Sequence, residues 1–254
     1  MKKNCCFLFL LLGFALPAGA QRIYKSTSVL AAGNWYKLSV SQPGIYKIDV
    51  PFLTKLGVNT NSLSSASIRL FGNGKGMLPE ACNGSRTDDL EENAIEMFDG
   101  GDGNFNGNDY LLFYAPGPDT WEKDSLNHRF KHRKNIYSNQ SFYFLNIGGN
   151  GLRIPVLPTV GNGNIVVNTF NERYFHELDS INFLSSGKDW FGEELSTLPG
   201  HSVTQSFTIS LNNLSQTEPG FLVSSCLARS IGGSSRISAS INGTSVIQHD
   251  IPAT

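Results

Sequence analysis

The sequence has 254 residues, with 20 lysines and arginines against 21 aspartates and glutamates, so its formal net charge is −1. A chain this close to neutrality has no long-range field that would attract a nucleic acid, and no nucleic-acid partner is expected. Hydrophobic residues make up 40% of the chain, including 17 phenylalanines, and 26 glycines supply turns. This composition predicts an all-β fold, β-sandwich-like in its N-terminal region, with two packed β subdomains.

The first twenty residues have the three parts of a secretory signal peptide. Lys2 and Lys3 precede an apolar run at 5–16, and the small residues Ala18-Gly19-Ala20 follow it. The apolar run is short for a membrane span. We therefore predict a signal peptide at 1–20 and export of the mature protein.

Two of the 4 cysteines, Cys5 and Cys6, lie in that signal peptide. Cys82 and Cys226 remain, and a disulfide between them is one interpretation for an oxidising compartment. Two unpaired thiols, with Cys226 buried in a strand, is the interpretation that we favour, because two distant cysteines make no framework.

The mature chain opens with β-type patterns. Trp35–Val40 and Ile45–Val50 alternate apolar and polar residues around a Gln-Pro-Gly turn, which predicts a β-hairpin. A short helical turn capped by Gly57 follows, then a strand over Ser67–Phe71 that ends in the turn Gly72-Asn73-Gly74. These elements begin an N-terminal β domain that we assign to 21–147.

The most informative stretch is the loop at 99–109, between a strand that ends at Phe98 and an apolar strand at 110–114. Asp102, Asn104 and Asn106 alternate before a glycine, which is the first half of a calcium loop of the D-x-[DN]-x-[DN]-G type. The closing glutamate of that motif is replaced by Phe113, although Asp99 and Asp109 would supply carboxylates. The sequence thus predicts a calcium site at five residues, or a hairpin loop without an ion. The five residues are Asp99, Asp102, Asn104, Asn106 and Asp109.

Basic residues are concentrated at 128–134, which we expect to be a loop. The cluster offers donors for a phosphate or an acidic sugar, but a solvated loop is the more common explanation for such a run. A strand at Phe142–Ile147 follows and is expected to pair beside the central hairpin.

Glycines and prolines at 148–163 predict a linker. Beyond it we expect a second β-sandwich-like domain at 164–254, truncated at its C-terminal end. Its expected strands are Ile165–Phe170, Val203–Leu211, Phe221–Arg229, Arg236–Ile241 and Ser245–Ile251.

Two features of this second half bear on function. His176, Glu177 and Asp179 lack the H-E-x-x-H spacing of a zinc site, because Ser180 stands where the second histidine would be. Trp190 and Phe191 lie together in a Gly- and Glu-containing loop and predict a contact surface, for a sugar or for another domain.

Several of these segments resemble one family in the same order. DGGDGNFNGNDYLLFYAPGPDTW and FKHRKNIYSNQSFYFL, with GIYKIDVPFLTKLGV and IRLFGNGKGMLPE before them and SGKDWFGEEL after them, are similar to the N-terminal region of type IX secretion system sortases. These are the PorU-like branch of the gingipain-type cysteine peptidases. The resemblance spans most of the mature chain.

The resemblance implies a longer protein with a downstream catalytic domain. That enzyme would remove the C-terminal sorting domains of secreted cargo and attach the cargo to surface lipopolysaccharide, at the outer membrane or cell surface, with the periplasm as the alternative location. Its expected partners are the catalytic domain of the same chain, secretion-system outer-membrane proteins and secreted cargo proteins. No catalytic residue carries over, because neither Cys82 nor Cys226 stands in the setting of a cysteine nucleophile. The alternative is a stand-alone exported β-sandwich module that binds a glycan or a partner protein.

Overall fold

The computed structural model describes residues 24–74, 76–158, 161, 163, 165–215 and 217–253. The predicted signal peptide at 1–20 lies outside these residues. The chain divides into two compact units. The described part of unit one covers 24–123, 130–163 and 186–188, and that of unit two covers 124–129, 165–185 and 189–253.

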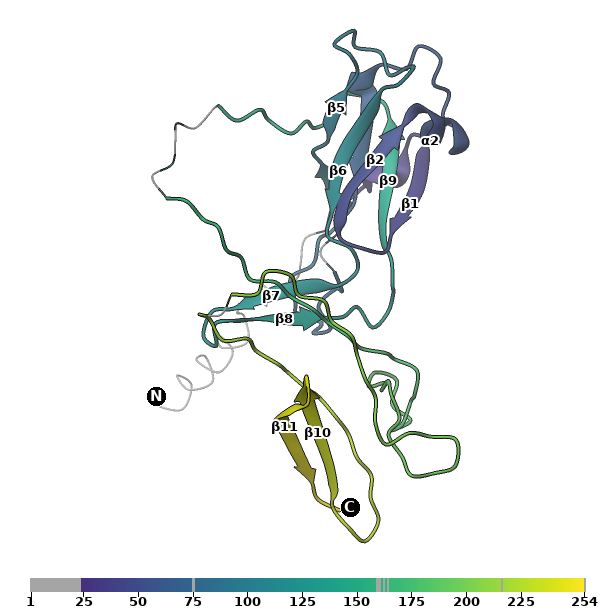
Figure 1. The fold of residues 1–254 in the computed structure, drawn as a ribbon. Coiled ribbons are helices and arrows are strands. Elements are labelled where there is room, and N and C mark those ends of the chain that lie inside the picture. The colour runs from purple at the N-terminus through teal and green to yellow at the C-terminus, as the bar shows by residue number, and fades with distance from the viewer. Residues whose placement is uncertain are drawn as a thin grey trace, which may run out of the picture. The chain divides into compact units, whose positions relative to one another are not determined.

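Unit one is an antiparallel β-sandwich, and the all-β prediction is confirmed (Figure 1). One sheet has the order β1 (Trp35–Val40), β9 (Ser141–Ile147), β3 (Ile68–Phe71) and β4 (Glu92–Asn93). The other has the order β2 (Gly44–Asp49), β6 (Tyr110–Ala115) and β5 (Glu96–Phe98). β2 and β6 alternate in burial, because one face of their sheet packs into the core and the other faces outward.

The inner faces of the two sheets share one hydrophobic core. Phe113 of β6 and Tyr143 of β9 meet across it with ring centroids 5.3 Å apart. The core also takes in residues from the connecting segments. Its members are Val40, Ile48, Leu53, Val58, Leu63, Ile68, Leu70, Ile95, Phe105, Leu111, Phe113, Ala115, Tyr143 and Leu145.

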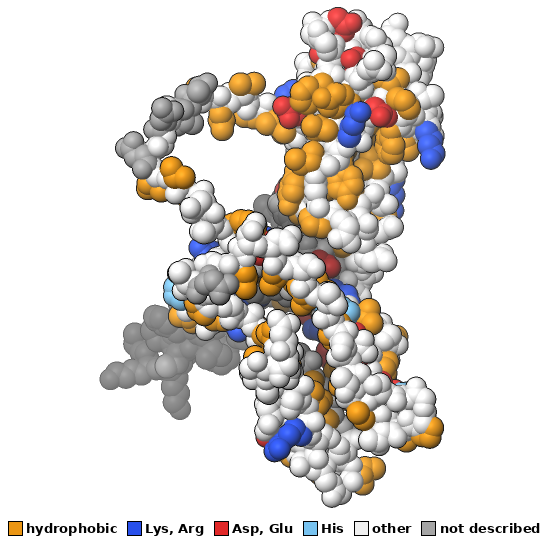
Figure 2. All heavy atoms as spheres, in the orientation of Figure 1, with side chains coloured by type: hydrophobic (Ala, Val, Ile, Leu, Met, Phe, Trp, Pro, Cys, Tyr) orange, Lys and Arg blue, Asp and Glu red, His pale blue; other side chains and the backbone are white. Residues whose placement is uncertain are grey.

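The outer face of the β2-β6-β5 sheet carries several apolar side chains beside the exposed Lys47 and Glu96. Ile45 of β2 and Tyr114 of β6 lie opposite each other, and both are largely exposed. Phe98 of β5 stacks on Tyr110 of β6 with ring centroids 4.7 Å apart. Figure 2 shows the hydrophobic side chains that gather over this part of unit one.

The helices are short. The α-helix α2 (Val50–Lys55) is capped at its N-terminus by Asp49, whose side chain accepts a hydrogen bond from the Phe52 amide at 3.0 Å. It is followed by Gly57 at φ 86°, which confirms the predicted glycine-capped turn. Two 3₁₀ helices, η1 (Val29–Ala31) and η2 (Ser65–Ser67), complete the set in unit one. Among the described residues, no helix has the length and apolar character needed to cross a membrane.

The predicted hairpin of the first two strands is wrong, although both strands exist. β1 pairs with β9 and β2 pairs with β6, so the chain passes from one sheet to the other at 41–43. Each strand has one apolar face, and this crossing lets the two faces meet across the core. For the same reason β9 lies between β1 and β3, not beside the β5–β6 hairpin as expected.

The Gly72-Asn73-Gly74 segment also differs from its prediction. Neither glycine has a positive φ, and the reason for their small size is Tyr143. A Cβ at Gly72 would lie 2.5 Å from the Tyr143 ring, and one at Gly74 would collide with its hydroxyl. Because Tyr143 is almost fully buried, the backbone can pass it only without side chains.

The segment that carries the basic cluster is a hairpin rather than a loop. Its strands are β7 (Thr120–Asp124) and β8 (Arg129–Arg133), which form a two-stranded sheet. Charged residues lie on both faces of these strands, so the sequence lacks the alternation of apolar and polar residues that would have predicted them.

Unit two contains the hairpin of β10 (Ser235–Ile241) and β11 (Thr244–Ile251), which confirms the last two predicted strands. Asn242 and Gly243 at its tip have φ of 48° and 85°, as an Asn-Gly hairpin turn requires. The runs predicted as strands at 165–170, 203–211 and 221–229 are not strands among the described residues. No described residue of unit two is buried.

Candidate functional site

The loop at 99–109 connects β5 to β6, as predicted. Phe98 and Tyr110 are paired at its base. Four of its glycines have positive φ, at Gly100 (66°), Gly101 (85°), Gly103 (75°) and Gly107 (56°). An L-residue rarely adopts these angles, so glycine is required for the path of this loop.

The loop is anchored by Phe105, whose side chain is fully buried in the core. The Phe105 amide donates to the Leu63 carbonyl at 2.7 Å, and the Ser65 amide donates to the Gly103 carbonyl at 3.0 Å. Ser64 and Asn104 form an antiparallel bridge between these bonds. Phe105 was not predicted as an anchor, although a single aromatic residue among small polar ones is a signal of such a role.

The carboxylates of the loop accept hydrogen bonds from backbone amides a few residues away. The pairs are Asp99 Oδ1 with Gly101 N at 3.1 Å, Asp102 Oδ1 with Asn104 N at 2.8 Å, and Asp109 Oδ2 with Asn106 N at 2.7 Å. Among the described residues, no three His, Cys, Asp or Glu side chains gather in a way that could hold a metal ion. Local turns of this kind account for the loop without an ion. The calcium site stays a prediction.

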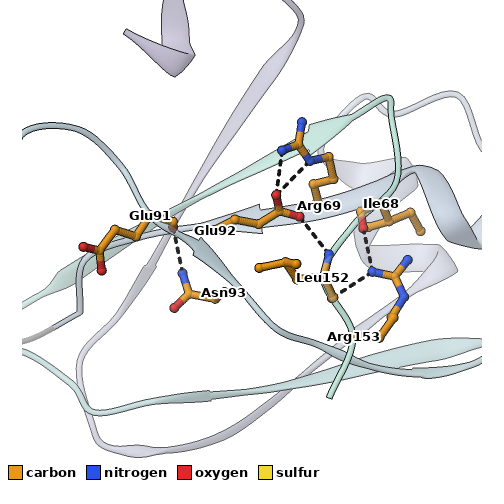
Figure 3. Close-up of polar contacts among 7 residues, drawn as sticks. All are labelled: Ile68, Arg69, Glu91, Glu92, Asn93, Leu152 and Arg153. Carbon is orange, nitrogen blue, oxygen red and sulfur yellow. Dashed lines mark hydrogen bonds and ion pairs between the residues drawn. The ribbon is translucent and has the colours of Figure 1, made fainter. Parts of the chain in front are cut away.

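A second polar cluster in unit one links β3, β4 and the segment after β9 (Figure 3). The Glu92 carboxylate accepts from Arg69 Nη2 at 2.6 Å and Nε at 3.1 Å, and its other oxygen accepts from the Leu152 amide at 2.9 Å. The Glu92 side chain is only 14% exposed. Burial alone would raise the pKa of Glu92, but the bonds from Arg69 and Leu152 lower the pKa below its ordinary value.

Arg153, in the segment that follows β9, belongs to the same cluster. Its guanidinium donates to the carbonyls of Ser65 at 2.6 Å, Leu152 at 3.0 Å and Ile68 at 3.3 Å. The backbone beside it pairs with Ile95, which donates to Leu152 and accepts from Ile154. Residues 152–154 therefore lie against the sandwich through an isolated parallel bridge between Ile95 and Arg153. We call Arg69, Glu92 and Arg153 the exit clamp, because they hold the chain where it leaves the sandwich.

The exit clamp was not found in the sequence analysis, which placed 148–163 in a linker. Its three charged residues are far apart in the sequence, and no motif joins them. Only the strand pairing brings them together.

The basic residues of the β7–β8 hairpin have acidic neighbours on the same hairpin. The ion pairs are Asp124 with Arg129 at 3.5 Å, Glu122 with Arg133 at 3.5 Å, and Asp119 with His132 at 3.7 Å. Burial lowers the pKa of His132, although the Asp119 carboxylate opposes this effect. Much of the positive charge is thus balanced locally, which disfavours the alternative that the basic cluster binds an anion.

In unit two, Trp190 is exposed, whereas Phe191 is half-buried and exchanges two 2.8 Å backbone hydrogen bonds with Ile181. His176 Nε2 lies 2.5 Å from Glu193 Oε1, and this hydrogen bond lowers the pKa of Glu193. The predicted contact surface therefore consists chiefly of the Trp190 side chain, and its binding role stays a prediction.

Cys82 and Cys226 both have free thiols. Cys82 is exposed and Cys226 is half-buried. The interpretation as two unpaired thiols agrees with this, but Cys226 does not lie in a strand.

The fold and these sites define an antiparallel β-sandwich with an attached second β unit. The chain is similar to the crystal structure of dimeric latent PorU from Porphyromonas gingivalis, with 25% sequence identity and a TM-score of 0.59. The match covers 89% of this chain and 20% of the PorU chain, so this chain spans about a fifth of that protein. No protein-family model and no curated protein matches the sequence. The chain thus has a PorU-like fold.

Proposed function

We propose that this chain is the N-terminal, non-catalytic region of a type IX secretion system sortase. The observation that carries the proposal is the similarity to PorU, at 25% identity over 89% of the chain. The sequence segments that resemble the same family lie in both halves of the chain, which supports the same conclusion. Because the match covers 20% of the PorU chain, the activity belongs to the complete protein rather than to these residues.

In this proposal the complete protein is a gingipain-type cysteine peptidase and transpeptidase. It removes the C-terminal sorting domain of secreted cargo and joins the cargo to surface lipopolysaccharide. The region described here supports and positions the catalytic domain. Its sandwich suits this role, because unit one has its own core and the exit clamp fixes the direction in which the chain leaves it.

The proposal is tested with an antibody to unit one, used in an immunoblot of fractionated native cells. A band far above 27.8 kDa in the outer-membrane fraction is expected. A band near 27.8 kDa, free in the periplasm or medium, would refute the proposal.

A stand-alone module that binds a glycan or a partner protein is the second candidate. The apolar side chains on the outer face of the β2-β6-β5 sheet favour it, since Ile45 and Tyr114 are exposed there. Contiguous exposed apolar surface of this kind marks interaction sites. The small soluble band would support this candidate, and a glycan screen with the Tyr114→Ala variant would then locate the surface.

A further inference from the structure

Three segments of unit two have the composition of strands but no strand partners. They are residues 165–170, 203–211 and 221–228, and we call them the open segments. Val203, Phe207, Ile209 and Leu211 alternate along the second of them, as apolar residues do in a strand. Within the described residues 165–215 and 217–234, however, no strand is formed.

The apolar side chains of the open segments are left in solvent. Val166 is 87% exposed, Phe207 49% and Val223 69%. Every buried residue of the described chain belongs to unit one, so unit two has no core of its own. Ordering such a chain costs conformational entropy that only burial of apolar surface can offset. Unit two therefore needs additional surface to cover it.

The charges of the chain indicate what kind of surface this is. Strands with an open edge in this protein each carry at least one charged residue, a common protection against unwanted pairing. Examples are Lys37 in β1, Lys47 in β2, Glu96 in β5, Arg236 in β10 and Asp250 in β11. The first two open segments contain no Lys, Arg, Asp or Glu, and the third is followed directly by Arg229, the last residue of the run predicted as a strand at 221–229. They have the composition of interior strands, which have neighbours on both sides.

A groove in unit two offers a second sign of a missing neighbour. It has a volume of about 700 Å³ and lies between residues 183–185 and 227–231. Phe183, Leu184, Leu227 and Ile231 make it mainly apolar, and Ser185 and Arg229 also line it. One wall belongs to the third open segment, so the groove is suited to apolar side chains from an incoming strand.

We propose that the open segments are interior strands of a sheet that is completed by strands from the remainder of the same polypeptide. This inference rests on the proposed function, in which a catalytic region follows. The PorU chain has 80% of its length outside the match, which is ample to supply those strands. A partner within the same polypeptide has an effective concentration in the millimolar range, so it covers uncharged edges as soon as they form. A second copy would leave them bare in dilute solution.

Hydrogen exchange of the native gene product, followed by mass spectrometry, tests this inference. Amides in 203–211 and 221–228 are expected to exchange at least about 100-fold more slowly than in an unprotected chain, and as slowly at twentyfold dilution. Fast exchange in both segments would overturn the inference. Protection that disappears on dilution would also overturn it, because the covering strands would then come from a second copy.

A matched pair of variants adds a local test. Ile209→Lys places a charge in an open segment, and Ile45→Lys makes the same change on the exposed face of β2. Ile209→Lys should make the amides of 203–211 exchange fast, whereas Ile45→Lys should leave their exchange as slow as in the native protein. Equal effects would contradict the inference. If the Ile209→Lys protein does not accumulate, the hydrogen exchange of the native protein still tests the inference.

The mass of the native product separates the two proposals. A long product with fast exchange in the open segments refutes only the completed sheet. A product of about 27.8 kDa refutes the proposed function, and the partner within the same polypeptide with it.

Discussion

The buried anchor of the 99–109 loop gives the sharpest prediction for unit one. Phe105 is fully buried, and a phenylalanine side chain removes about 150–250 Å² from water. At about 25 cal/mol per Å² this burial is worth roughly 4–6 kcal/mol, and measured Phe→Ala losses in cores are about 3–5 kcal/mol. Phe105→Ala should therefore lower the free energy of unfolding of unit one by about 3–5 kcal/mol.

The matched control is Tyr114→Ala, because Tyr114 is an aromatic residue of the same sheet but is 64% exposed. It should cost about 1 kcal/mol, mostly as lost strand propensity. Urea unfolding is followed by the fluorescence of Trp35, which packs edge-on against Phe71 in unit one, in a background where the other tryptophans are phenylalanine. If Phe105→Ala costs no more than Tyr114→Ala, the loop is held by something other than its aromatic anchor.

Three further predictions concern unit one. Glu92→Gln should lose about 1.5–3 kcal/mol at pH 7, because it weakens charged hydrogen bonds that are largely buried. The folded pKa of Glu92 is lowered, so the wild type should lose this contribution as the pH falls below the unfolded value of 4.5. The pKa values of Asp89 and Asp99 are lowered too, so Glu92→Gln should still lose stability over that range, but less than the wild type; equal pH profiles in urea would contradict this. Gly74→Ala should cost about 1–3 kcal/mol in thermal unfolding because its Cβ meets the buried Tyr143, whereas Gly44→Ala, with only one atom at 4.0 Å, should be nearly neutral. A calcium site in the 99–109 loop predicts heat in a calorimetric titration and a stabilisation of about 2.7 kcal/mol at 100 times the dissociation constant, both lost in Asp102→Asn; absence of heat in the wild type would remove the calcium prediction.

The strands of unit one were largely predictable, but their pairing was not. Alternation shows which face of a strand is buried, and this located β1, β2, β6 and β9. It says nothing about the neighbour, so the first two strands were expected to pair with each other. Their separation into two sheets follows from how the faces fill a common core, which is a property of the whole unit.

The candidate sites also combine features that the local sequence predicts with features that depend on the fold. The loop at 99–109 was predicted correctly, because its glycines meet a local requirement for positive φ. Phe105 and the exit clamp were missed, because their roles depend on contacts with segments more than twenty residues away. Gly74 was interpreted as part of a turn when its size is set by Tyr143, a neighbour only in the fold.

Unit two separates two conditions that a strand must meet. The first is a suitable sequence, and the residues at 203–211 meet it with regular alternation and no charge. The second is a neighbour with free hydrogen-bonding groups and an apolar face, since an isolated strand or hairpin is at best marginally stable. The β10–β11 hairpin meets the second condition locally through its Asn-Gly turn, and its charged residues Arg236 and Asp250 bond each other at 2.6 Å. The open segments do not meet this second condition within unit two, so their strand pattern implies a structural partner. The hydrogen-exchange experiment tests whether that partner lies in the same polypeptide.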